Sequence, residues 1–284
     1  MKTILITGGN GKVGSALIER LSKYTILSPH SRELDCLNKN DLLRYVHTHT
    51  PDVILHAAAF TDVSAAEKER GEKSGRCYRV NVDGTQHIVD AAKAIGAYLI
   101  FISTGSVFSG TVENPGPFNE DQPHMKKDDL SWYAYTKAVA EDRIFGNGAI
   151  LRISHPIGYI EPMLQSYNRG ELFPLFTDQW FPLTDIDAMA LCINALISKN
   201  RIGIYHEVSR DVVSPFELIS YCVKHFNKIG PHISTMQFSD FIKTATNPKR
   251  YAQFCALDGA FTHKTLQLPD YSWKDAVHLD SKIV

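Results

Sequence analysis

The sequence predicts an α/β protein, with a doubly wound parallel sheet and a smaller C-terminal lobe. The chain has 284 residues and is 44% hydrophobic, so it is long and apolar enough to bury a full core. Over its first half, short apolar runs alternate with longer segments of helical period. A glycine-rich turn joins the first apolar run to the first helical segment.

The predicted elements follow in a regular order up to about residue 160. The apolar runs predict strands at Thr3–Thr7, Tyr24–Leu27, Val53–His56, Tyr98–Ser103 and Ala149–Ile153. The helical period predicts helices near 12–23, 39–49, 74–95 and 131–145.

Beyond residue 160 the pattern loosens into "ELFPLFTDQWFPLTDIDAMALCINALI", "IYHEV" and "PFELISYCVKHF". We therefore expect a first domain over residues 1–160 and a smaller lobe over residues 161–284. The chain is expected to cross back from the lobe to the first domain.

Charge and cysteine content exclude several classes of protein. The 30 basic and 31 acidic residues nearly cancel and form no long run, so no nucleic-acid partner is expected. The five cysteines lack CxxC spacing and suit a reducing cytoplasm. No leader pattern is seen, and no apolar run approaches the roughly 18 residues of a membrane span. His47 and His49 lack a nearby third ligand, so no metal site is expected.

The turn after the first strand has the form TGxxGxxG, with glycines at Gly8, Gly11 and Gly14. A dinucleotide pyrophosphate needs a tight turn, a bare backbone and a helix N-terminus that faces the anion. The pattern therefore predicts the cofactor turn of a Rossmann domain, which makes residues 1–160 the NAD(P)-binding domain. The alternative is a tight turn without a ligand. The candidate cofactor residues in this turn are Gly8, Asn10, Gly11, Lys12, Val13 and Gly14.

The stretch "ILSPHSRELD" after the second strand bears on which dinucleotide is bound. An acid at the strand end would bind the ribose hydroxyls of NAD, whereas an arginine would accept the 2′-phosphate of NADP. Arg32 and His30 favour NADP. Glu33 and Asp35 follow closely, so NAD stays the alternative, and Arg32 in a surface loop is a further interpretation.

A candidate catalytic group follows further along the chain. "YLIFISTGSVF" ends a strand at Ser103 and Thr104, and "SWYAYTKAVAEDRI" begins a helix that carries Tyr133 and Lys137. Positions i and i+4 share a helix face, so the ammonium group is expected to lower the pKa of the phenol. Tyr135 is the rival phenol, but Val139 occupies its i+4 position.

The chain resembles an extended short-chain dehydrogenase/reductase, and within that group the dTDP-4-dehydrorhamnose reductase family of dTDP-rhamnose biosynthesis. The resemblance covers nearly the whole chain. Its motifs include "ILITGGNGKVGSAL", "PDVILHAAAFTDV", "VNVDGT", "FISTGSVF", "YAYTKAVAE", "DQWFPLT" and "GIYHEVSRDVVSPFELI".

The resemblance implies a Rossmann domain, a small C-terminal lobe for a nucleotide-linked 4-keto-6-deoxy sugar, and reduction by NADP or NAD. It implies that Tyr133 protonates the keto oxygen, that Lys137 holds the nicotinamide ribose, and that Thr104 hydrogen-bonds the substrate. It adds these cofactor-binding candidates: Asp35, Cys36, Ala57, Ala58, Ala59, Asn81 and Ser103. The alanines are alternatively a packed strand end. Asn81 is expected to brace the site, or alternatively is a helix cap.

The substrate side departs from the family pattern at two places. Gly105-Ser106 stands where the family usually has an acid and an aromatic residue, and Ser154-His155-Pro156 stands where it commonly has "TSW". Another 4-keto sugar nucleotide therefore remains open as substrate. The candidate substrate-binding residues are Thr104, Gly105, Ser106, Val107, Tyr133, Ser154 and His155, with Asp178, Gln179 and Thr184 as weaker candidates. The segment 105–130 is expected to cover the substrate, or is a surface insertion.

Three functions stay open at this point. The first is a sugar-nucleotide reductase. The second is an epimerase with tightly bound NAD, whereas a dehydratase is disfavoured because Gly105-Ser106 offers no Asp-Glu pair. The third is a non-catalytic, NADP-binding regulatory subunit resembling the partner of methionine adenosyltransferase. A homodimer is a further expectation from the family.

Overall fold

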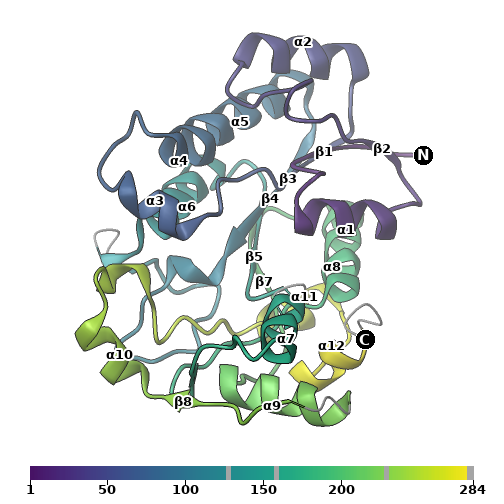
Figure 1. The fold of residues 1–284 in the computed structure, drawn as a ribbon. Helices are drawn as coiled ribbons and strands as arrows, with labels where there is room; N and C mark the ends of the chain where they lie inside the picture. The colour runs from purple at the N-terminus through teal and green to yellow at the C-terminus, as the bar shows by residue number, and fades with distance from the viewer. Residues whose placement is uncertain (126–128, 157–159, 227–229, 280–284) are drawn as a thin grey trace.

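The structure is a computed structural model that describes residues 1–125, 129–156, 160–226 and 230–279. Six parallel strands form its central sheet, in the order β2-β1-β3-β4-β5-β7 (Figure 1). Their bounds are β1 Thr3–Thr7, β2 Thr25–Leu27, β3 Val53–His56, β4 Tyr98–Thr104, β5 Ala149–Ile153 and β7 Gly203–Glu207. The chain goes from β1 to β2 on one side and then to β3 on the other. Ligands of open parallel sheets bind outside the carboxyl ends of the strands at such a reversal.

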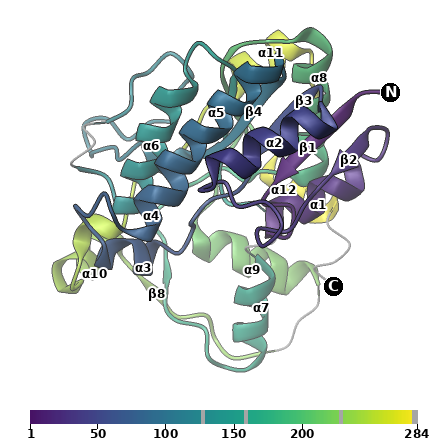
Figure 2. The same cartoon turned by 90° about the horizontal axis from the view of Figure 1, so that it is seen from above.

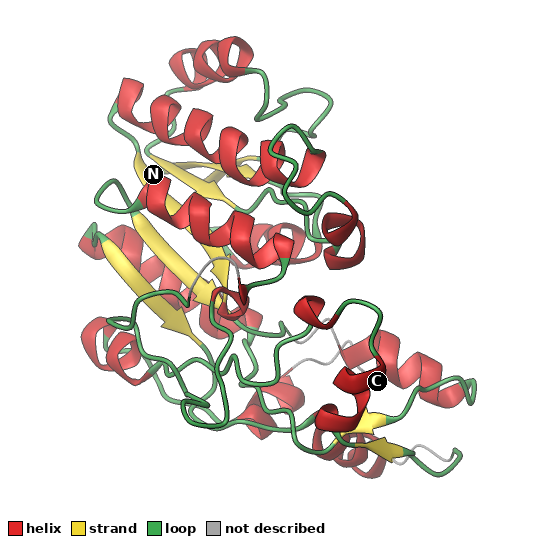
Figure 3. Ribbon diagram, turned by 90° about the vertical axis from the view of Figure 1, so that its left-hand side faces the viewer, coloured by secondary structure: helices red, strands yellow, loops and turns green. Residues whose placement is uncertain are grey.

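Helices cover both faces of this sheet (Figure 3). Because strand side chains alternate, Ile4 and Ile6 lie in one apolar cluster and Leu5 lies in another. The first cluster contains residues of α1 (Lys12–Arg20), α8 (Ile186–Lys199) and α11 (Ala260–Leu266). The second contains residues of α2 (Lys39–His49), α5 (Gly84–Ile95) and α6 (Trp132–Ile144). This layered arrangement is a Rossmann fold.

A separate apolar core is made of residues from position 160 onward. It includes side chains of α7 (Ile160–Asn168), α9 (Pro215–His225) and α12 (Trp273–Leu279). Helices α7 and α9 lie side by side, below the layer of α2 and α5 in Figure 2. The remaining elements of this part are β6 Leu175–Phe176, β8 Thr235–Met236, α10 Phe238–Thr244 and η5 Pro248–Arg250.

The chain crosses back from this part to the main sheet. The stretch "IYHE" lies in β7, which pairs with β5 in parallel, and α8 and α11 pack on the same sheet. "IYHEV" thus contributes to the sheet layer and not to the second core. The division of the chain at residue 160 stays a prediction.

The strand predictions agree closely with the structure. Three strands have the predicted bounds, the second begins at Thr25, and the fourth continues to Thr104. The helix expected over 74–95 is interrupted. It consists of α4 (Arg76–Tyr78), a π-helical turn η1 (Arg79–Asp83) and then α5. Two short elements without a counterpart in the prediction are α3 Val63–Lys68 and the 3-10 turn η2 Gly105–Val107.

Candidate active site

The glycine turn packs too tightly for any side chain at two of its positions. Gly8 has a φ of +73°, and a Cβ added there would lie 2.6 Å from the Ala58 backbone. A Cβ on Gly14 would lie 2.3 Å from the carbonyl oxygen of Gly8. The Gly11 N–H donates to that same oxygen at 2.9 Å. Helix α1 then begins at Lys12 with a glycine as its N-cap, so its first N–H groups are available to an anion.

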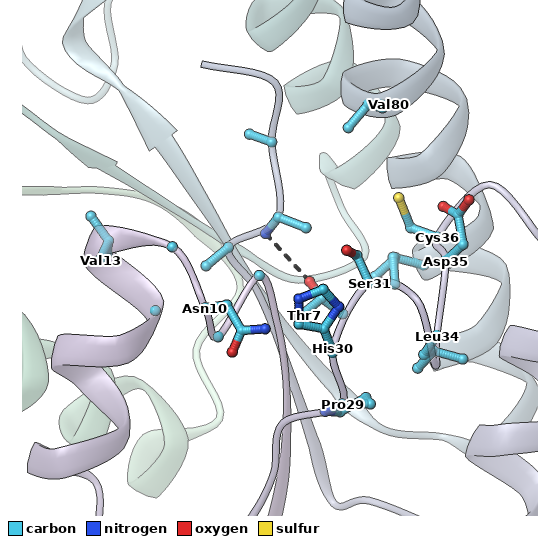
Figure 4. Close-up of a pocket in the computed structure, with 18 of the residues that line it drawn as sticks. Thr7, Asn10, Val13, Pro29, His30, Ser31, Leu34, Asp35, Cys36 and Val80 are labelled. Carbon is cyan, nitrogen blue, oxygen red and sulfur yellow. Dashed lines mark hydrogen bonds between the residues drawn. The ribbon is translucent and has the colours of Figure 1, made fainter. Parts of the chain in front are cut away.

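A cavity of about 890 Å³ opens over this turn, at the reversal between β1 and β3. In Figure 4, Thr7 of β1, Asn10 of the glycine turn and Val13 of α1 line the cavity, and Cys36 and Val80 line it from other parts of the chain. The Ala58 N–H donates to Thr7 Oγ1 at 3.4 Å (dashed in Figure 4), which ties the end of β3 to β1. A bare glycine cradle, a helix N-terminus and a cavity of this size fit a dinucleotide.

Most of the predicted cofactor residues line this cavity. They are Gly8, Asn10, Gly11, Lys12, Val13, Gly14, Asp35, Cys36, Ala57, Ala58 and Ala59. The lining also includes residues that the sequence analysis did not single out, among them Ser31, Leu34, Thr61, Arg76 and Pro156. Arg32, Asn81, Ser103, Tyr133 and Lys137 lie outside the lining.

The loop after β2 presents polar groups to the cavity. His30, which lines the cavity, receives a hydrogen bond at Nδ1 from the Arg32 N–H (3.1 Å). The carboxylate of Glu33 is turned back on the loop, where it accepts from the His30 N–H at 2.9 Å. Asp35 lines the cavity and accepts from the Leu37 N–H at 2.9 Å. Arg32 is exposed and lies outside the cavity lining, so its role toward a 2′-phosphate stays a prediction.

Helix α6 begins at a Ser131 cap, whose hydroxyl accepts from the Ala134 N–H. Near its start, burial and the Cys77 thiol raise the pKa of Tyr133 to about 12, opposed by a hydrogen bond from Thr104. Tyr133 is therefore protonated at neutral pH. The phenol of Tyr133 and the hydroxyl of Thr104 meet at the carboxyl end of β4, as the sequence predicts.

Lys137 differs from the sequence-based expectation. Its Nζ donates to the Ile102 carbonyl oxygen at 2.7 Å and lies 3.8 Å from the centre of the Phe101 ring. Burial lowers the pKa of this buried lysine to about 7. Lys137 is not among the groups that set the pKa of Tyr133 in the structure. The physical reason is that the Lys137 amine points back to β4. Lys137 therefore does not lower the pKa of Tyr133, although the sequence led us to expect this.

Two further predicted cofactor residues support the site from behind. The Ser103 hydroxyl donates to Glu141 Oε1 inside the protein. Asn81 Oδ1 accepts from the Phe60 N–H at 2.7 Å, and its Nδ2 donates to Phe60 O and to Thr136 Oγ1. Asn81 thus braces the chain after β3 against α6, and neither a helix cap nor a direct cavity contact describes it.

On the substrate side, Gly105, Ser106 and Val107 form the turn η2 directly after Thr104. The His155 ring stacks on Phe181 with ring centres 3.8 Å apart, and its backbone has a φ of +34°. Burial lowers the pKa of His155 to about 4, so the ring is neutral near pH 7.

Ser154 and the three weaker candidates are held by structural bonds. The Ser154 N–H donates to Thr184 Oγ1 at 2.9 Å, and Thr184 in turn donates to Glu207 O. Asp178 and Gln179 bond to the chain at Phe238, Ala252 and Gln253. These bonds give Thr184, Asp178 and Gln179 a role in folding the second half of the chain.

The segment 105–130 is joined to a distant part of the chain, apart from residues 126–128, which lie outside the described residues. Its backbone bonds residues 254–258: Gly110 N–H donates to Phe254 O at 2.6 Å, and Phe118 N–H donates to Ala256 O at 2.8 Å. These bonds tie Gly110 and Phe118 to the C-terminal part of the chain, and the covering of the substrate by this segment stays a prediction.

Sequence reasoning missed a buried ionic cluster behind the site. Glu141 follows Lys137 by one turn of α6 and pairs with Arg152 of β5. His124 of the segment 105–130 contacts both partners. The i+4 spacing of Lys137 and Glu141 was a signal that could have revealed it. Within the described ranges, no group of three or more His, Cys, Asp or Glu side chains is arranged to hold a metal ion.

Comparison with known proteins adds to this geometry. The family model described as RmlD substrate binding domain matches residues 1–281. A dTDP-4-dehydrorhamnose reductase from Aggregatibacter actinomycetemcomitans is 29% identical over 235 residues, covering 76% of each chain. The methionine adenosyltransferase 2 subunit beta of Pongo abelii is 29% identical over 259 residues, covering 82% of this chain and 74% of its own.

Solved structures resemble the whole chain. The crystal structure of dTDP-4-dehydrorhamnose reductase from Bacillus anthracis in complex with NADP superposes with a TM-score of 0.85. The alignment covers 98% of this chain and 97% of the other, at 24% identity, and so supports the fold. Within the described residues, no helix is both long enough and apolar enough to cross a bilayer.

Proposed function

Because the chain belongs to the RmlD substrate binding domain family, we propose that it is an NADP-dependent reductase of a nucleotide-linked 4-keto-6-deoxy sugar. The observation that carries the proposal is the glycine-lined cavity at the ends of β1 and β3, with Tyr133 and Thr104 interacting at the end of β4, the strand paired with β3. The relative from Aggregatibacter actinomycetemcomitans is named as such a reductase, and the neighbour from Bacillus anthracis was solved with NADP.

The glycine turn and the residues around Cys36 and Ala58 would hold the dinucleotide, which when bound would supply the hydride for the keto carbon. Tyr133 donates its phenolic proton to the keto oxygen, so that one O–H bond breaks and another forms as the ketone becomes an alcohol. Thr104 donates a hydrogen bond to the same oxygen. A pKa of about 12 keeps Tyr133 in the proton-donating form at neutral pH. Lys137 lies one turn further along the same helix, with its amine bonded to the Ile102 carbonyl oxygen, and the phenolate left on Tyr133 is stabilised by the hydrogen bond from Thr104.

Net cofactor oxidation tests this proposal. Purified protein with NADPH and a dTDP-4-keto-6-deoxy sugar should lose absorbance at the reduced-nicotinamide band. Tyr133→Phe should slow the loss by about 10²- to 10⁴-fold, the usual contribution of a general acid. Tyr135→Phe is the matched control, because that ring stacks on Trp132 at 4.8 Å on the same helix. An unchanged rate in Tyr133→Phe would remove the proposed acid, and turnover without net oxidation would indicate an epimerase.

A non-catalytic regulatory subunit is the second candidate. It is favoured by the identity to the methionine adenosyltransferase subunit, which equals the identity to the reductase and covers more of this chain. The same assay separates the two. Cofactor binding without oxidation of any 4-keto sugar nucleotide, together with co-purification with a methionine adenosyltransferase catalytic subunit, would favour the regulatory role.

We also propose that residues 161–284 supply the substrate-binding lobe, and that the protein works in the cytoplasm as a homodimer. Five free cysteines are consistent with a reducing compartment. Light scattering of the purified protein would give the subunit number.

A further inference from the structure

The cofactor cavity has a cationic residue far from the glycine turn in sequence. Arg76, the first residue of α4, lines the cavity together with Thr61 and Val80. In Figure 4, Val80 belongs to a different element from Asn10 of the glycine turn and Val13 of α1. The cavity thus offers an anion a guanidinium group in addition to the backbone N–H groups of α1.

The charge of Arg76 is not neutralised by any residue that the structure describes. Its side chain is exposed, and its guanidinium carbon lies 5.9 Å from the centre of the Phe60 ring. Among the described residues, no carboxylate pairs with this guanidinium. A cation held over an aromatic ring keeps its N–H donors available at its edge.

The aromatic support of Arg76 is fixed in place. Both backbone groups of Phe60 bond the Asn81 amide, at 2.7 Å for the N–H and 3.1 Å for the carbonyl oxygen. Asn81 is buried and also bonds Thr136 of α6 at 2.9 Å. The ring beneath Arg76 is therefore part of the braced chain after β3.

We propose that Arg76 binds the pyrophosphate of the bound dinucleotide, as a partner to the N-terminus of α1. A planar guanidinium matches two phosphate oxygens with two parallel hydrogen bonds, which lysine cannot do. The inference rests on the proposed function, because it assigns a further contact to the same cofactor.

Binding measurements separate this assignment from its rivals. Tryptophan-fluorescence or calorimetric titration of the full chain with NADPH, NADH and dTDP should be compared for wild type, Arg76→Ala and Arg76→Lys. Loss of a charge-assisted contact predicts about tenfold weaker binding of both NADPH and NADH by Arg76→Ala. The dinucleotide affinity of Arg76→Lys should lie between those of the wild type and Arg76→Ala. The affinity for dTDP should be the same in all three proteins. Arg79→Ala is the control, because Arg79 is exposed, is near in sequence and lies outside the cavity lining.

Each other outcome contradicts the assignment. A loss confined to NADPH would place Arg76 at the 2′-phosphate, and a loss confined to dTDP would place it at the substrate diphosphate. If Arg76→Ala binds each of the three ligands as tightly as the wild type does, Arg76 makes no phosphate contact. Failure of the wild type to bind either dinucleotide would overturn the proposed function itself, before any variant is measured.

Discussion

Glu141 of α6 and Arg152 of β5 form an ion pair inside the protein, with Arg152 Nη2 2.7 Å from Glu141 Oε2. Both side chains are buried, and Ser103 of β4 donates to the same carboxylate. The pair joins the helix that carries Tyr133 to the two strands that end beside it. The position of Tyr133 relative to Thr104 therefore depends on a bond that lies outside the cavity.

Replacement of Glu141 by Gln should destabilise the protein by about 3 kcal/mol, because it leaves the Arg152 charge buried and incompletely paired. Urea unfolding measures the change. Arg44→Ala is the matched control, since Arg44 and Asp41 form an exposed pair whose loss should change stability by less than about 1 kcal/mol. A loss for Glu141→Gln no larger than that of the control would show that the buried pair is not stabilising.

The stability of the protein should depend on pH through Lys137. Its pKa is about 7 when folded and higher when unfolded, so the unfolded chain binds more protons between these values. Stability therefore rises with pH from about 7, by at most about 1.4 kcal/mol per pH unit from this group. The difference in unfolding free energy between wild type and Lys137→Met, measured by urea unfolding at pH 7.0 to 8.5, should change with that sign. A difference that stays constant over this range would contradict the low pKa.

Gly14→Ala should abolish tight cofactor binding while the chain still folds. The added Cβ would lie 2.3 Å from the Gly8 carbonyl oxygen and must displace the turn that contacts the pyrophosphate. We expect NADPH affinity to fall by more than about tenfold, measured by fluorescence titration. Gly71→Ala serves as control for a glycine replacement outside the cavity lining, since a Cβ on Gly71 would have open space around it. Its NADPH affinity should equal that of the wild type.

Arg32→Ala should weaken the binding of NADPH more than the binding of NADH. We expect the NADPH affinity to fall by about fivefold, which is the scale of a solvent-exposed charge contact. The expectation follows from the exposed position of Arg32 next to His30, which lines the cavity, and from Glu33 being engaged by the loop backbone. Titrations at low and high salt check it, since the NADPH preference should shrink as salt increases. Equal weakening of both dinucleotides would remove the 2′-phosphate role.

The sequence predicted the sheet well because its strands are short apolar runs bounded by turns. Neighbouring residues such as Ile54 and Leu55 are buried on opposite faces of the parallel sheet, and this leaves a continuous apolar signal. The prediction of one continuous helix over 74–95 was less accurate. Its break at Arg79–Asp83 surrounds Asn81, whose side chain bonds the loop after β3, and such a long-range contact leaves no periodic signal.

The sequence predicted which residues belong to the candidate site better than it predicted how their side chains are oriented. The glycines were recognisable because a backbone approach of this kind excludes side chains. The orientation of Lys137 was not, because the Ile102 carbonyl and the Phe101 ring that receive it come from another element. For the same reason Arg76 was missed, since only the fold brings α4 to the cavity.

The late return of the chain to β7 has a consequence for any attempt to divide this molecule. A fragment ending near residue 160 would leave β5 as a bare outer strand, with Ile150, Leu151 and Ile153 next to unpaired backbone groups. Such an edge recruits other chains, so that fragment would precipitate rather than remain as a monomer. The solubility of the cofactor-binding part therefore depends on β7, which begins some fifty residues after β5 ends.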